Sequence, residues 1–165
     1  MKTIQLLTAA TAVLALAACE TTPGSEGGAG GTGIDGTSGS YDSSVTPGTQ
    51  ADLNANIGDR VYYATDSSTL DSEAQATLSR QAAWLNQYSS VNITVEGHCD
   101  ERGTREYNIA LGERRAYAAK KYLVSQGVSP DRISTVSYGK ERPAAIGSDA
   151  SSWAQNRRAV SVVVQ

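Results

Sequence analysis

Hydrophobic residues after position 60 recur at two spacings, one typical of strands and one typical of helices. Four short segments either alternate apolar with polar residues or are rich in strand-favouring residues, namely 60–64, 91–96, 132–137 and 158–164. Two longer segments repeat apolar residues every three or four positions, which predicts amphipathic helices over about 71–88 and 106–126. A short helical turn is expected at 151–155.

Capping and turn residues bound the two long helices. Asp71 or Ser72 is a good N-terminal cap for the first helix, and Gly127 is a typical terminator of the second. The core-facing stripes are expected to be Ala74, Leu78, Ala82 and Leu85 in the first, and Ile109, Gly112, Ala116, Ala119 and Leu123 in the second. Because strands alternate with helices, we expect an α+β domain of βαβ units with a mixed four-stranded sheet and helices packed on one face.

The first residues have the pattern of a secretory signal. Lys2 precedes an apolar run at residues 6–15, which is too short to cross a bilayer comfortably. Small residues lead up to Cys19, and a cysteine in that place resembles a bacterial lipobox. The resemblance implies removal of residues 1–18, lipidation of Cys19 and, with Glu20 next, sorting to the outer membrane. A plain secretory signal or a short membrane anchor is the alternative.

Residues 20–50 have the composition of a flexible tether. Nine of the chain's sixteen glycines lie between Gly24 and Gly48, mixed with Ser, Thr and Pro, and no apolar residue recurs at a regular period. Such a segment buries too little surface to offset the entropy lost on ordering. We therefore divide the chain into a signal peptide, a lipidated cysteine with its tether, and a folded domain, at residues 1–18, 19–50 and 51–165.

Charge and cysteine content argue against nucleic-acid binding and against an internal disulfide. The formal net charge is −3, becoming −4 once Lys2 is removed with the signal, and the pI is about 5.1. A nucleic-acid partner needs a basic patch, so none is expected. Lipidation of Cys19 would leave Cys99 as a lone thiol, and an internal disulfide is therefore not expected.

Polar residues of complementary charge gather where the second strand leads into the second long helix. Asp100 lies just past the strand and Arg115 lies within the helix, so rigid elements would hold both side chains. A carboxylate and a planar guanidinium together suit a ligand that carries an ammonium and a carboxylate side by side. Asn108, Leu111 and Arg115 recur at helical spacing and share one face. From charge pattern alone, a solvated loop of paired surface charges is an equal alternative.

Several motifs in this half of the chain resemble one family. They are Glu96-Gly97-His98, Asp100-Glu101-Arg102-Gly103-Thr104, Glu106-Tyr107-Asn108, Leu111-Gly112-Glu113-Arg114-Arg115-Ala116, Ser137-Tyr138-Gly139-Lys140-Glu141-Arg142-Pro143 and Asn156-Arg157-Arg158-Ala159-Val160. Together they resemble the OmpA-like peptidoglycan-binding domain, in the form typical of the peptidoglycan-associated lipoprotein (Pal) family, over roughly residues 58–164. The resemblance implies an OmpA-like two-layer sandwich. Cys99 departs from the motif, since Thr or Ala is usual there.

The resemblance implies noncovalent binding of the peptide stem of peptidoglycan through meso-diaminopimelate. Asp100 matches the family aspartate that takes the ammonium of this residue, and Arg115 matches the arginine that takes its carboxylate. Lysine has no carboxylate at that end, so lysine-type peptidoglycan should bind poorly. The other expected ligand residues are Asn108, Leu111 and Asp66. The residues expected at the rim are Tyr63, Thr104, Arg157 and Arg158. The hydroxyl of Tyr63 is expected to reach solvent or the rim. Which of the two arginines faces the site is left open.

Partners and location are also implied by the resemblance. They are peptidoglycan, the periplasmic protein TolB, and the outer membrane through the lipid on Cys19, within the Tol–Pal system that serves envelope integrity and cell division. No cofactor and no metal is expected. The alternatives are another OmpA-like wall-binding lipoprotein without a Tol partner, and a protein-interaction module that does not bind the wall.

His98 and Cys99 suggest a catalytic pair, but adjacent residues at a strand end point to opposite sides. We expect His98 to be a hydrogen-bonded structural residue and the protein not to be an enzyme. One His and one free Cys are too few for a structural zinc site, although an open site with carboxylates stays an alternative. Asp100→Ala or Arg115→Ala should abolish binding to sacculi while the fold survives.

Overall fold

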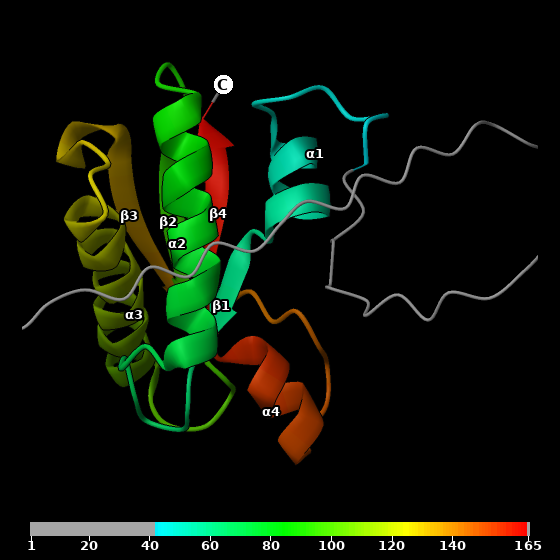
Figure 1. Ribbon diagram of the computed structural model, residues 1–165. Helices are drawn as coiled ribbons and strands as arrows, with labels where there is room; N and C mark the ends of the chain where they lie inside the picture. Colours follow the sequence, from blue (N-terminus) through cyan, green and yellow to red (C-terminus); the bar gives the residue numbers. More distant parts are fainter. Residues whose placement is uncertain (1–41, 165) are drawn as a thin grey trace, which may run out of the picture. The chain divides into compact units, whose positions relative to one another are not determined.

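A computed structural model of the chain describes residues 42–164 (Figure 1). The predicted signal, the lipidation site at Cys19 and most of the predicted tether lie outside the described residues. No helix within residues 42–164 is long and apolar enough to cross a membrane.

Four strands and two long helices make up most of the described chain. The strands are β1 (Arg60–Tyr62), β2 (Asn92–His98), β3 (Ile133–Gly139) and β4 (Arg158–Val164). The long helices are α2 (Ser72–Gln87) and α3 (Arg105–Ser125). Shorter helical segments are α1 (Gln50–Asp52), the π-helical turn η1 (Leu53–Ile57), the 3₁₀ turn η2 (Pro130–Arg132) and α4 (Ala150–Asn156). Every predicted strand and helix is present, with its ends within two residues of the predicted bounds.

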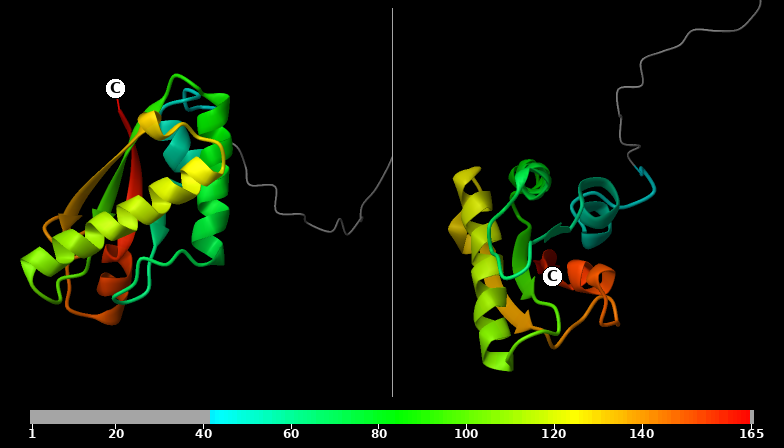
Figure 2. Two further views of the ribbon diagram at one scale, coloured as in Figure 1. Left: turned by 90° about the vertical axis from the view of Figure 1, so that its left-hand side faces the viewer. Right: turned by 90° about the horizontal axis from the view of Figure 1, so that it is seen from below.

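The sheet has the strand order β1-β4-β2-β3. Strand β4 runs antiparallel to both of its neighbours, β1 and β2, whereas β2 and β3 are parallel. The connections from β1 through α2 to β2, and from β2 through α3 to β3, therefore advance in the same direction across the sheet. Because such crossovers are right-handed, both helices lie on one face (Figures 1 and 2). The predicted α+β fold is confirmed.

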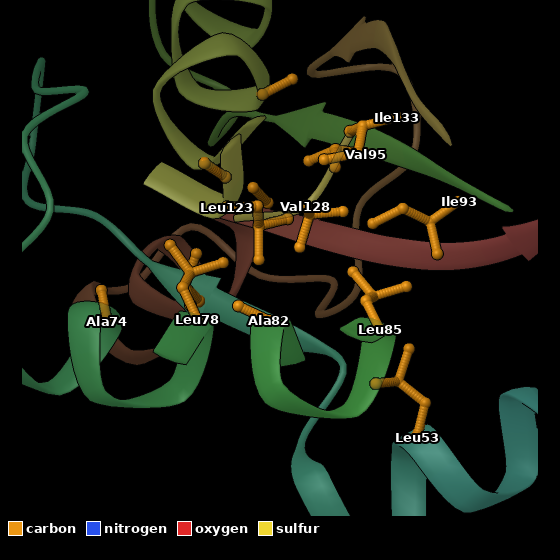
Figure 3. Packing of buried hydrophobic residues seen from close by; sticks show 14 of the residues in the cluster. Leu53, Ala74, Leu78, Ala82, Leu85, Ile93, Val95, Leu123, Val128 and Ile133 are labelled. Carbon is orange, nitrogen blue, oxygen red and sulfur yellow. The ribbon is translucent and has the colours of Figure 1, made fainter. Parts of the chain in front are cut away.

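The core lies between this face of the sheet and the two long helices (Figure 3). All four residues of the stripe predicted for α2 are buried, and they point toward residues such as Ile93 and Val95 of β2. In α3 the predicted stripe is buried except for Ile109, which is half-buried. Burial of these apolar side chains is the main stabilising term of the domain.

Two glycines bring α3 unusually close to the sheet. A Cβ atom on Gly97 of β2 would lie 1.9 Å from the carbonyl oxygen of Gly112 in α3, and one on Gly112 would lie 2.3 Å from Oγ of Ser137. Any side chain at either position would therefore push the helix away from the strands. The contact fixes the first turns of α3 beside the end of β2, where the charged loop between them lies.

Both apolar contacts and hydrogen bonds hold the residues that precede β1: Leu53 is buried in the core, and Ile57 packs against it. Asp52 is buried, and its carboxylate accepts hydrogen bonds from the indole of Trp84 (2.8 Å), the backbone of Gly48 (2.9 Å) and the amide of Asn56 (2.8 Å). The backbone of Asp42 donates to Oδ1 of Asn56 at 2.7 Å. Contacts with the domain thus begin before the boundary predicted at residue 51, because hydrogen-bonded polar residues leave no hydrophobic period in the sequence.

Candidate ligand-binding site

A cavity of about 290 Å³ opens at the lower end of the domain in Figure 1, where β2 leads into α3. Its walls come from the segment after β1, the loop after β2 and the first three turns of α3. The lining residues are Thr65, Asp66, Cys99, Asp100, Arg102, Gly103, Tyr107, Asn108, Leu111 and Arg115. All five residues predicted to bind a ligand therefore line one cavity.

Arg115 forms the positive side of the cavity and is completely buried. Its Nε donates to the carbonyl of Ser67 at 2.8 Å, Nη1 to that of His98 at 2.8 Å, and Nη2 to that of Ala64 at 3.2 Å. Its guanidinium also lies 5.3 Å from the ring centroid of Tyr63. These contacts come from two separate stretches of chain, the segment after β1 and the end of β2, and leave the group one orientation.

The hydrogen-bonding capacity of Arg115 is only partly used by the described residues. A guanidinium carries five N–H groups and keeps its charge in proteins. Three of the five donate to the carbonyls above, which leaves one N–H on each Nη atom for a ligand. Burial lowers the pKa of Arg115 and so marks the cost of holding this charge away from water. An anionic oxygen entering the cavity would offset that cost.

Asp100 forms the negative side of the cavity and is 7% exposed. Its Oδ1 accepts from the backbone N (3.2 Å) and Nε (3.1 Å) of Arg102, and its Oδ2 accepts from Nη2 of Arg102 at 2.7 Å. Nη1 of Arg157 lies 3.5 Å from the same Oδ2. Burial alone would raise the pKa of Asp100, but these hydrogen bonds outweigh it and hold the pKa below the usual value, so the group is a carboxylate at neutral pH.

Only one of the two adjacent arginines before β4 faces Asp100. Arg157 donates to the carbonyl of Tyr63 at 3.0 Å and reaches Asp100, although it does not line the cavity. Arg158 turns away and donates to the carbonyls of Asn156 (3.4 Å) and Arg142 (3.2 Å). The choice that the sequence left open therefore falls on Arg157.

Asn108 and Thr104 shape the loop between β2 and α3. Thr104 caps α3, with its hydroxyl accepting from the backbone of Tyr107 at 3.2 Å. The amide of Asn108 donates to the carbonyls of Arg102 (2.8 Å) and Thr104 (3.0 Å). Asn108 thus fixes the loop while its side chain lines the cavity, whereas Thr104 caps the helix outside the cavity and Leu111 supplies an apolar wall.

Asp66 and Tyr107 close the opposite side of the cavity. Asp66 has a left-handed backbone, with φ of 54°, which is uncommon outside glycine. Its carboxylate accepts a hydrogen bond from the hydroxyl of Tyr107. Tyr107 was not predicted as a site residue, although the spacing of Tyr107, Leu111 and Arg115 by four residues places them on one helical face and could have revealed it.

Tyr63 lies beneath the site and not at its rim. The side chain is 4% exposed, and its hydroxyl donates to the backbone carbonyl of Arg115 at 2.8 Å. The expectation that this hydroxyl reaches solvent or the rim is therefore wrong. Burial raises the pKa of Tyr63, so the hydroxyl is protonated at neutral pH and can donate this hydrogen bond. Tyr63 supports the helix turn that carries Arg115.

His98 and Cys99 point to different sides of the chain, as predicted. Cys99 lines the cavity, is buried, and its thiol donates to the carbonyl of Asn108 at 3.3 Å. Burial raises the pKa of this thiol, which makes it a poor nucleophile. His98 is also buried, but both of its ring nitrogens lack hydrogen-bond partners; Oε2 of Glu96 lies 3.4 Å from Nε2. The expectation of a hydrogen-bonded His98 is therefore wrong.

Metal-binding residues do not gather in the described part of the chain. Within residues 42–164, no group of three or more His, Cys, Asp or Glu side chains stands close enough to hold a metal ion. The cavity instead has a carboxylate, Asp100, and a guanidinium, Arg115, in its lining. That pairing suits a zwitterionic head group, an ammonium and a carboxylate on one carbon.

Comparison with known proteins places the chain in a family. Residues 62–157 match the OmpA family. The chain is 59% identical over 120 residues to the peptidoglycan-associated lipoprotein of Mesorhizobium japonicum, covering 73% of this chain and 71% of the relative. It is 58% identical over 120 residues to that of Rhizobium meliloti, covering 73% and 68%.

Solved structures agree with this assignment. The crystal structure of the peptidoglycan-associated lipoprotein from Burkholderia pseudomallei matches with a TM-score of 0.63 and 43% identity, over 64% of this chain and 90% of that one. The C-terminal domain of Helicobacter pylori MotB shares the fold, with a TM-score of 0.60 and 24% identity over 65% of this chain and 84% of that one. The chain therefore belongs to the OmpA family and, within it, to the peptidoglycan-associated lipoproteins.

Proposed function

We propose that this protein binds peptidoglycan noncovalently, by holding the amino-acid head of meso-diaminopimelate in the peptide stem between Asp100 and Arg115. Membership of a non-enzymatic family agrees with a site that binds and does not catalyse. The names of the most similar relatives support both peptidoglycan association and lipidation. The finer claim, recognition of diaminopimelate, rests on the chemistry of the cavity.

The observation that carries the proposal is the state of Arg115. A buried guanidinium is costly unless it is paired, yet the three carbonyls leave one N–H on each Nη atom unused, and Arg115 lines the cavity. A ligand carboxylate would accept these two donors, and each charge-assisted bond contributes about 1.5–3 kcal/mol. Asp100 in the same cavity supplies the charge that an ammonium needs.

Selectivity follows from the same geometry. Lysine at the equivalent stem position offers an ammonium without a carboxylate on the same carbon. Arg115 would then stay unpaired, and a site built for a polar group discriminates strongly against a ligand that lacks it. The site should therefore prefer diaminopimelate-type to lysine-type peptidoglycan.

The first experiment is a pulldown of the full chain, solubilised in detergent, with purified sacculi. Binding should be displaced by free meso-diaminopimelate and not by lysine. Asp100→Asn should reduce binding at least tenfold, since the ammonium loses its counter-charge. Asp131→Asn, which removes an exposed carboxylate on the 3₁₀ turn η2, is the matched control and should bind like the original chain. Equal competition by lysine, or full binding by Asp100→Asn, would refute the proposal.

Anchoring and partnership complete the proposed role. Lipid on Cys19 would tie the chain to the outer membrane, and the domain would tie that membrane to the wall, with TolB as a partner within the Tol–Pal system in envelope integrity and cell division. Mass spectrometry of the membrane fraction, including Cys19→Ser as a control, tests the lipid. Pulldown with TolB separates this role from that of a wall-binding lipoprotein without a Tol partner.

A further inference from the structure

Asp100 has no vacant acceptor position for a ligand. An ionised carboxylate offers about four lone-pair sites. Four donors occupy them here: the backbone N, Nε and Nη2 of Arg102, and Nη1 of Arg157. A ligand ammonium can therefore reach Asp100 only if one of these donors leaves.

The four donors are not equally free to leave. The backbone N of Arg102 cannot move freely, because the backbone of this residue is fixed in the loop. The side-chain amide of Asn108 donates to the carbonyl of Arg102 at 2.8 Å. The side chain of Arg157 is 14% exposed, is held by the carbonyl of Tyr63, and lies outside the cavity lining. The side chain of Arg102 is 42% exposed and lines the cavity. Its guanidinium is the donor that can move.

The surroundings of Arg102 offer its side chain other contacts. Its guanidinium carbon lies 4.2 Å from the ring centroid of Trp153, an arrangement that attracts a cation without involving Asp100. Nη2 also lies 3.4 Å from Oγ1 of Thr65 at the cavity wall. The indole of Trp153 donates to the carboxylate of Glu101 at 3.1 Å, so a second negative group lies beside the same ring. A guanidinium that leaves Asp100 would not be left without partners.

We propose that Arg102 occupies the place of the ligand's ammonium in the free protein, and that binding of a zwitterionic head group displaces the Arg102 side chain from Asp100. Arg102 is thus a specificity-determining residue of the proposed diaminopimelate site, and the inference rests on that proposed function. Its presence reduces what the ammonium gains from Asp100, since one charged pair is exchanged for another. It also keeps Asp100 neutralised while the site is empty.

Arg102→Gln tests the proposal, because it removes the competing cation while the backbone contacts of residue 102 remain. The full chain in detergent is titrated by NMR with two probes: meso-diaminopimelate, and pimelate, the same seven-carbon dicarboxylate without amino groups. We expect meso-diaminopimelate to bind about two- to fivefold more tightly to Arg102→Gln, the scale of an exposed ion pair. Pimelate should bind to Arg102→Gln no more tightly than to the original chain, because the carboxylate of Asp100, no longer paired with Arg102, repels a dianion.

Matched variants separate this role from a general change of charge or of loop structure. Arg105→Gln removes an exposed arginine that pairs with Glu141 outside the cavity and should change neither affinity. Arg102→Lys keeps the charge without the two-pronged contact and should give an intermediate gain for meso-diaminopimelate. Weaker binding of both probes by Arg102→Gln would show a supporting role for the loop and overturn the inference.

Failure of the inference can be told from failure of the proposed function. If the original chain binds meso-diaminopimelate but Arg102→Gln gains nothing, the displacement is wrong and the site assignment stands. If the original chain binds neither sacculi nor meso-diaminopimelate, both proposals fall.

Discussion

Arg115 and Arg158 are the two arginines that the described part of the chain buries, and their surroundings differ in kind. Arg115 makes three hydrogen bonds to carbonyls, two of them at 2.8 Å, and faces a cavity. Arg158 makes two hydrogen bonds to carbonyls, at 3.2 and 3.4 Å, and its Nε has no partner. It does not line the cavity that Arg115 faces. Burial of a cation is therefore not enough to indicate a binding site.

The neighbours of the two arginines reinforce this contrast. Arg115 shares its cavity with the carboxylate of Asp100. Arg158 lies near His98, whose pKa is lowered to about 4 by burial and then by the positive charges of Arg158 and Arg142. One arginine lines a cavity beside a carboxylate, and the other raises the cost of protonating a buried histidine. The contrast teaches that a candidate site needs open space and unused donors as well as charge.

Removing Arg115 should have the largest effect. Arg115→Met should weaken binding of meso-diaminopimelate more than about 100-fold, since two charge-assisted hydrogen bonds are lost. It should also lower the free energy of unfolding by about 3–5 kcal/mol, because three buried carbonyls lose their donor. NMR titration and urea unfolding measure the two effects. A variant as stable as the original chain would contradict the structural role.

The sequence predicted that the fold survives loss of Arg115; the structure adds that the surviving fold should be less stable. Asp100→Asn is the informative partner variant, because an amide still accepts hydrogen bonds from Arg102 while the charge is gone. If both variants lose ligand binding and only Arg115→Met loses stability, the role of Arg115 in binding is separated from its role in holding the fold together.

Acid should lower the stability of the domain through protonation of His98. Its folded-state pKa of about 4 lies below the ordinary value of 6.5, so the unfolded chain binds more protons between these two pH values. Stability should therefore fall as the pH is lowered from 6.5 to 4, by up to about 3 kcal/mol from this group. His98→Gln should remove that part of the pH dependence in urea unfolding at pH 7, 5.5 and 4. An unchanged slope would show that His98 is already protonated or exposed in the native state.

Replacing Arg158 should have the smallest effect. Arg158→Met should leave binding of meso-diaminopimelate unchanged and the free energy of unfolding within about 1 kcal/mol at pH 7, since its hydrogen bonds are long and incomplete. It should also raise the pKa of His98, which NMR titration of the imidazole would detect. Loss of ligand binding in this variant would contradict the contrast between the two buried arginines, because it would place Arg158 in the site.

The fold was predictable because its signals are periodic. Alternating apolar residues marked the strands, and the stripes headed by Ala74 and Ile109 marked the long helices, within two residues of the observed ends. Residues 42–50 were assigned to the tether because the contacts of Asp42 and Gly48 are hydrogen bonds to the polar side chains of Asn56 and Asp52. A hydrogen-bonded polar segment carries no hydrophobic period, so the sequence cannot reveal it.

The site was predictable in its members and not in its internal pairing. Motifs and helical spacing gave five candidate ligand residues that line one cavity, whereas the four residues predicted at its rim do not line it, namely Tyr63, Thr104, Arg157 and Arg158. Whether Arg157 or Arg158 turns toward Asp100 depends on the register of β4 against its neighbours, which the sequence does not contain. The same holds for the hydroxyl of Tyr63 and for the pairing of Arg102 with Asp100, since both are set by packing in three dimensions.

The three carbonyls that hold Arg115 have a mechanical consequence. They belong to Ala64 and Ser67 in the segment after β1, and to His98 at the end of β2, while the arginine itself is part of α3. Tension applied through a molecule gripped by this guanidinium would be divided among a helix, a strand and the segment that follows another strand. Under the proposed function, no single loop would have to bear the pull between the outer membrane and the wall.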